Sequence, residues 1–145
     1  MYTAVVIQRT CLILLMLSAC SDSSEDDIRA HVTFAIKQEG KTATDAAEYL
    51  SRYGRRAIPT IEAAMHTASP AGKKNLILAL RKIGDAEAVP LLRHIALFDP
   101  SVDVQREAEW TLKQWAAGAA ADPRTEKARA AVRAIDEHRG TEEAG

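Results

Sequence analysis

The chain has 145 residues, with 19 Lys and Arg against 20 Asp and Glu, and its formal net charge is -1. A surface that binds DNA or RNA needs an excess of cations, so this balance argues against a nucleic-acid binder. Hydrophobic residues make up 47% of the chain and aromatic residues only 5%, a composition that favours helices in one domain with a modest core.

The first predicted element is a targeting segment. Arg9 precedes an apolar run, residues 11–17, which ends at the small residues Ser18 and Ala19. Seven apolar residues cannot cross a bilayer core, which needs about 20. Extending the span back to Thr3 would bury Arg9 in hydrocarbon. We therefore predict that residues 1–19 are a cleaved signal peptide, with a transmembrane anchor as the alternative.

The end of this segment is more specific. Leu17-Ser18-Ala19-Cys20 resembles the lipobox of bacterial lipoproteins. The resemblance implies that Cys20 carries a diacylglyceryl group and an N-acyl chain such as palmitate, and two or more acyl chains anchor a protein stably. Residues 20–25 would form a tether in the cell envelope, facing the periplasm. Ser21 stands where Asp would direct retention in the inner membrane, so the outer membrane is favoured. The alternative is a conventional signal peptide and a soluble secreted domain.

The same assignment accounts for both cysteines. Cys11 would leave with the signal peptide and Cys20 would become a thioether. The mature domain would then hold no free thiol, which argues against disulfides, thiol catalysis and Cys-ligated metals.

The rest of the chain repeats itself. Residues 46–54 align with 76–84 and 108–116, and residues 57–61 align with 88–92. Apolar side chains recur on one helical face of the first set: Ala46, Leu50, Tyr53, Leu76, Leu80, Ile83, Ala108, Leu112 and Trp115. A single helix cannot bury such a stripe, so we predict stacked antiparallel helix pairs, an all-α fold forming a short α-solenoid.

The helix boundaries follow from the turn residues. We expect helices near residues 26–39, 43–53, 57–67, 72–83, 87–98, 103–116 and 123–138. Gly54 and Gly84 should end two of them, and Pro59 and Pro90 should lie in the first turn of the next. The repeat domain would span residues 26–138, and residues 139–145 would be a flexible tail.

One repeat has a recognisable family pattern. Residues 84–92, Gly-Asp-Ala-Glu-Ala-Val-Pro-Leu-Leu, resemble the start of a HEAT-type repeat of the bacterial, phycobilisome-lyase-like class. The likeness covers about residues 43–116 and fades in the first unit, where Arg55-Arg56 replaces the acidic turn. The resemblance implies an α-solenoid and a protein-binding scaffold. It carries over no catalytic residue, and nothing in the chain matches a lyase active site.

Catalytic and metal-binding patterns are weak in this sequence. The four histidines, His31, His66, His94 and His138, lie on four different expected helices without metal-ligand spacing. Carboxylates such as Glu107 stand beside basic residues such as Arg106, which is typical of a solvated helix face. A phosphate loop, a nucleophile elbow and a Ser/His/Asp grouping are all missing from the sequence. We therefore expect no enzymatic activity, metal, cofactor or small-molecule substrate.

The repeat register instead predicts a binding ridge. The second helix of each pair lines the concave face of such solenoids, so residues opposite its buried stripe should be available to a partner. The candidate protein-binding residues are Arg52, Leu78, Arg81, Lys82, Trp110 and Lys113. The alternative is that Trp110 belongs to the core and the cations are merely solvated, whereas we assign Trp115 to the core.

The sequence as a whole predicts a lipid-anchored envelope scaffold for a protein partner that it does not identify. Two alternatives remain: a structural or assembly subunit of a larger envelope complex, and an accessory to an enzyme such as a chromophore lyase.

Overall fold

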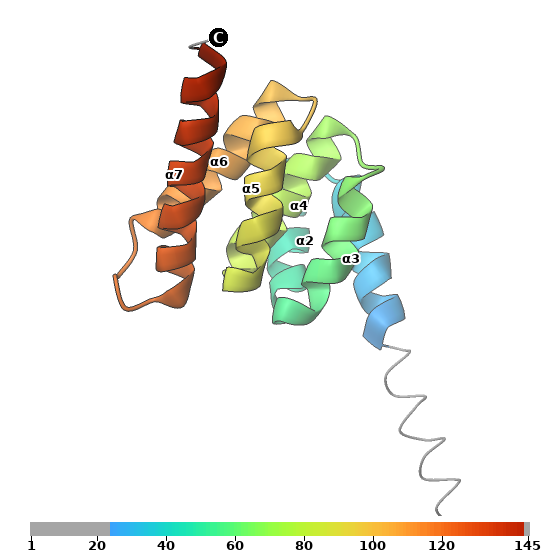
Figure 1. Ribbon diagram of the computed structural model, residues 1–145. Coiled ribbons are helices and arrows are strands. Elements are labelled where there is room, and N and C mark those ends of the chain that lie inside the picture. Colours follow the sequence, from blue (N-terminus) through green and yellow to red (C-terminus); the bar gives the residue numbers. More distant parts are fainter. Residues whose placement is uncertain (1–23, 144–145) are drawn as a thin grey trace, which may run out of the picture.

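The computed structural model describes residues 24–143, and these form an all-α solenoid of antiparallel helices (Figure 1). The first helix covers residues 24–36. It is followed by α2 (Gly40–Ser51), α3 (Ile58–Met65), α4 (Pro70–Ile83), α5 (Val89–Phe98), α6 (Val102–Ala116) and α7 (Pro123–Glu143). Short 3-10 turns, η1 (Gly54–Ala57) and η2 (Ala86–Ala88), lead into α3 and α5. The predicted fold class is confirmed.

The helices stack in the order of the chain. Helix α4 packs between α2 and α6, so that α2, α4 and α6 form one row. Helix α3 contacts α4, α5 contacts α6, and α7 contacts both α5 and α6. The first helix joins α4 through Asn75, whose side-chain amide donates to the backbone carbonyls of Ala35 and Gln38 at 2.9 and 2.8 Å.

Most of the turn residues act as the sequence predicts. Gly84, with φ +66°, caps the end of α4 in the left-handed conformation in which a side chain is strained. Gly54 also has a positive φ, +57°, but α2 already ends at Ser51, with Arg52 as its C-cap, and Gly54 begins η1. Pro59 and Pro90 lie in the first turn of α3 and α5, where no helical hydrogen bond requires their missing N–H. These residues divide the apolar stripes into hairpins of two helices each.

A continuous core runs along the stack. Its repeated centre is Leu50, Leu80 and Leu112, which are fully buried on α2, α4 and α6. Tyr53 and Ile83, predicted on the same stripe, are only half-buried. The reason is that Tyr53 lies beyond the end of α2 and Ile83 is the last residue of α4, so part of each side chain reaches solvent.

Both ends of the domain differ from the prediction. Residues 24 and 25, expected in the tether, already belong to the first helix. Helix α7 continues to Glu143, so residues 139–143, expected in the tail, are helical. Arg139 explains the extension, because its Nη1 lies 2.6 Å from Oε2 of Glu109 on α6. The predicted signal peptide, residues 1–19, and Cys20 lie outside the described residues.

Candidate protein-binding face

Trp110 and Arg81 form the most prominent feature of the predicted ridge. Trp110 is 48% exposed on α6, whereas Trp115, on the other side of the same helix, is 5% exposed. The guanidinium carbon of Arg81 lies 4.6 Å from the centre of the Trp110 ring, a cation–π arrangement. The alternative that Trp110 belongs to the core is therefore wrong, and the core position of Trp115 is confirmed.

Arg81 is held in place by a second contact. Its Nη1 donates to Oε1 of Glu107 at 2.9 Å, and both side chains are about a third exposed or less. The guanidinium is thus fixed between a carboxylate and an indole ring, all on α4 and α6. We call Arg81, Glu107 and Trp110 the Trp110 face. Because its side chains are already ordered, a partner would lose little entropy in using them.

Lys82, another of the predicted cations, is also paired with a carboxylate. Lys82 on α4 donates to Oε2 of Glu48 on α2 at 2.8 Å. This hydrogen bond, with the charges of Lys82 and Arg52, lowers the pKa of Glu48. Exposed pairs of this kind add little stability, but together they link the row of α2, α4 and α6 at its surface.

A buried carboxylate continues the pairing to α7. Burial raises the pKa of Glu109, but hydrogen bonds and charges from Lys113 and Arg139 outweigh it, so the pKa is lowered on balance. The Nζ of Lys113 and the Nη1 of Arg139 each lie 2.6 Å from a Glu109 oxygen. Lys113 therefore belongs to the junction between α6 and α7 and is not an isolated cation of the ridge.

The two remaining candidates are separate from this centre. Arg52 caps α2 and lies over the ring of Tyr49 on the same helix, 5.1 Å from its centroid. Leu78 is half-buried and packs against the core. Among the predicted residues, the structure brings Arg81 and Trp110 into direct contact, while the other four contact different neighbours.

Sequence reasoning missed the carboxylates that organise this face. The sequence predicts that Glu107 lies on a solvated face beside its chain neighbour Arg106, but Glu107 pairs with Arg81, 26 residues away. Glu109 was not singled out, although it is buried and binds two cations. For Glu109 the available signal is a carboxylate at the register position that Ala47 and Ile77 occupy in the earlier repeats, because a charge at a buried position needs cationic partners.

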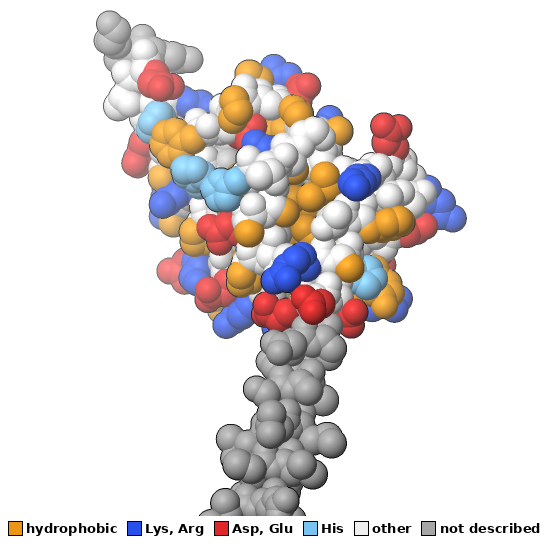
Figure 2. All heavy atoms as spheres, turned by 90° about the vertical axis from the view of Figure 1, so that its right-hand side faces the viewer, with side chains coloured by type: hydrophobic (Ala, Val, Ile, Leu, Met, Phe, Trp, Pro, Cys, Tyr) orange, Lys and Arg blue, Asp and Glu red, His pale blue; other side chains and the backbone are white. Residues whose placement is uncertain are grey.

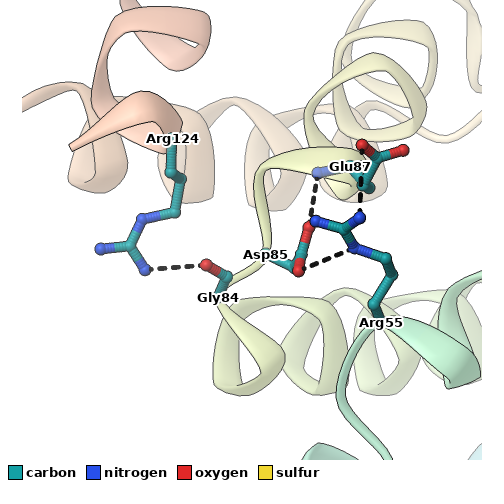
Figure 3. A network of polar contacts seen from close by, with 5 residues as sticks. All are labelled: Arg55, Gly84, Asp85, Glu87 and Arg124. Carbon is teal, nitrogen blue, oxygen red and sulfur yellow. Dashed lines mark hydrogen bonds and ion pairs between the residues drawn. The ribbon is translucent and has the colours of Figure 1, made fainter.

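The turns between repeats carry a second polar network (Figure 3). Arg55, in η1, pairs with Asp85 at 3.2 Å and with Glu87 at 4.0 Å, both at the start of the next hairpin. A hydrogen bond from the backbone N–H of Glu87 makes the largest contribution to lowering the pKa of Asp85. Arg124, from the start of α7, donates to the carbonyl of Gly84 at 3.2 Å. Arg55 replaces the acidic residue expected at this turn of the repeat. Its basic side chain is suited to this position because it faces Asp85 of the following unit.

The comparison with protein families agrees with this architecture. A family model described as HEAT repeats matches residues 13–113, more than two thirds of the chain. The chain belongs to the HEAT-repeat family. The match begins within the segment predicted as a signal peptide. The HEAT-repeat chain matched no curated protein and no solved structure in the two other comparisons.

A further surface of the HEAT-repeat domain is a groove between α3 and α5. It has a volume of about 540 Å³, and His66, His94 and Phe98 are among its lining residues. Phe98 is 57% exposed and its ring lies 5.2 Å from that of His94. Figure 2 shows histidine and hydrophobic side chains side by side along one edge of the molecule.

Residues 24–143 contain neither a metal-binding cluster nor a membrane-spanning helix. Within them, three or more His, Cys, Asp or Glu side chains do not come together in a way that could hold a metal ion. Within the same range, every helix is too short or too polar to cross a bilayer.

Proposed function

We propose that this HEAT-repeat protein is a lipid-anchored scaffold of the bacterial cell envelope, facing the periplasm, which binds a protein partner through the Trp110 face. The observation that carries the proposal is the exposed indole of Trp110 stacked on Arg81, which Glu107 holds in place. Tryptophan and arginine are the residue types most often found at binding hot spots. HEAT repeats stack into extended surfaces that bind other proteins.

The anchor is supported by the sequence. Leu17-Ser18-Ala19-Cys20 has the lipobox pattern, and Ser21 favours the outer membrane. We propose no catalytic role, because the polar side chains of the Trp110 face are paired with one another and none is poised as a nucleophile or base.

Crosslinking in the native envelope, followed by mass spectrometry, would test the binding face. Trp110→Ala should lower partner recovery strongly, because loss of a hot-spot residue costs about 2 kcal/mol or more, roughly thirty-fold in affinity. Phe98→Ala, an exposed aromatic residue elsewhere on the surface, is the matched control and should keep recovery unchanged. Undiminished recovery with Trp110→Ala and Arg81→Ala combined would contradict the proposal.

The anchor has its own control. Cys20→Ala should release the domain from the membrane fraction, and full retention of this variant would contradict lipidation at Cys20.

A second candidate function is an assembly subunit within a larger envelope complex. It is favoured by the groove between α3 and α5, where Phe98 is the most exposed aromatic side chain. In that case Phe98→Ser, and not Trp110→Ala, should abolish co-purification in a fixed ratio.

A further inference from the structure

The two ends of the solenoid expose very different surfaces. Terminal units of a repeat stack need a polar outer face, because nothing packs against them. Helix α7 has one, with exposed charged residues that include Glu126, Lys127, Arg133 and Glu137. The opposite end, formed by the first helix and α2, leaves Phe34 50% exposed and Tyr49 42% exposed. We call this surface the Phe34 face.

The Phe34 face is hollowed and mainly apolar. A groove of about 540 Å³ lies between the first helix and α2, lined by Ala30, His31, Phe34, Thr42, Asp45, Ala46 and Tyr49. The ring of His31 stacks on that of Tyr49 with 4.3 Å between centroids. His31 Nδ1 lies 2.6 Å from the carbonyl oxygen of Asp27, which fixes the stack. The aromatic floor is therefore formed before anything binds, and Phe34 projects beside it.

The short length of chain between Cys20 and the first helix limits how far the Phe34 face can lie from a membrane anchor on Cys20. Cys20 lies four residues before Ser24, where the described helix begins. Even fully extended, four residues span only about 14 Å. From Ser24 to His31 the helix rises about 10 Å. A lipid on Cys20 would thus hold the Phe34 face close to the headgroups of the membrane.

We propose that the Phe34 face lies against the lipid surface as a second membrane contact. This inference rests on the lipid anchor of the proposed function. Aromatic side chains with a polar tip, such as Tyr49, are favoured at the boundary between headgroups and acyl chains. The Trp110 face, on α4 and α6, is separated from this end by α2 and stays available to a partner.

The charged side chains at this end of the solenoid indicate which headgroup charge the Phe34 face would tolerate. Between residues 24 and 53 there are four basic side chains, Arg29, Lys37, Lys41 and Arg52, and Arg56, which donates to Ser24 at 2.6 Å, adds a fifth. The same range has six acidic ones, Glu25, Asp26, Asp27, Glu39, Asp45 and Glu48. Anionic headgroups attract basic segments and would not favour this surface. The lipids that suit it are zwitterionic.

The experiment uses the lipidated chain in vesicles of zwitterionic phospholipid that carry a nitroxide on some headgroups. The proposed mature chain has no free thiol, so Ala30→Cys provides a unique labelling position in the Phe34 face. Ala130→Cys, exposed on α7, is the matched control. We expect several-fold stronger quenching of a fluorophore at position 30 than at position 130. Equal quenching at the two positions would overturn the proposal.

Further variants distinguish the occupants. Phe34→Ser should weaken quenching at position 30 while the protein stays attached, and its melting curve shows whether it folds. A fluorophore at position 30 could instead be shielded from water without being quenched by the nitroxide. If, in addition, the detergent-solubilised chain sediments as a dimer, a second copy covers the Phe34 face and the proposed membrane contact is wrong. Release by Cys20→Ala tests the anchor separately, so failure of the contact and failure of the anchor give different results.

Discussion

Glu109 is a residue whose protonation should weaken the fold. Its pKa in the folded state lies below the ordinary value of 4.5, because Lys113 and Arg139 outweigh the effect of burial. A lowered pKa contributes stability above pH 4.5, and this contribution is lost as the pH falls through the folded-state pKa. Melting temperatures between neutral and acidic pH should therefore fall more steeply for the native chain than for Glu109→Gln. Parallel pH profiles would contradict this role.

Gly84 provides a second test at the level of single residues. An Ala side chain here would meet a φ of +66°, and its Cβ would lie 2.8 Å from Nη1 of Arg124. The left-handed backbone alone costs about 1–2 kcal/mol, so Gly84→Ala should destabilise the domain by at least that amount in urea unfolding. Gly140 in α7 is the control, because a Cβ there meets nothing within 4 Å. Gly140→Ala should stabilise by about 0.5–1 kcal/mol.

The two tryptophans show how far a sequence determines individual positions. Trp115 falls on the same repeat register as Leu112, and its burial could be predicted from that periodicity alone. Trp110 is placed by the same register on the outside, but its contacts are not local. Arg81 reaches it from another helix, and Glu107 pairs with Arg81 across 26 residues. Many outward-facing side chains could form such contacts, and the packing of the helices determines which of them come close enough to do so.

At the level of helices, the central leucines should dominate stability. Leu112 is fully buried on α6, so Leu112→Ala should cost about 2–5 kcal/mol through lost burial and the cavity left behind. Leu97, on α5, is only half-buried and is the matched control. Urea unfolding of both variants should show the larger loss for Leu112→Ala. Equal losses would mean that α6 does not form the centre of the core.

Helix boundaries could be predicted where a special backbone conformation marks them. Gly54, Gly84, Pro59 and Pro90 each mark a turn, and the structure follows them. The end of α7 could not be predicted in this way. Within the last turn His138 lies 3.9 Å from Glu142, and the ion pair of Arg139 with Glu109, 30 residues earlier, ties these turns to α6. A contact between distant residues overrides the local tendency of a chain end to fray.

At the level of the whole molecule, the continuous core predicts a single unfolding transition. Buried residues from the first helix to α7 belong to one cluster, so no unit has a core of its own. Both tryptophans lie on α6 and report that region, whereas far-UV circular dichroism reports all helices. The midpoints of the two signals in urea should coincide. An earlier dichroism midpoint would show that the first helices unfold independently.

The pair of Arg55 and Asp85 has a consequence for the order of the repeats. Equivalent turns of two successive units have side chains of opposite sign, and each sign fits only its neighbour. If the unit containing Asp85 were duplicated to lengthen the protein, two carboxylates would meet where a cation and a carboxylate meet now. The two repeats are therefore not equivalent at this turn: duplicating the unit with Asp85 would replace an attraction by a repulsion, which a longer engineered array would avoid by alternating the two charges.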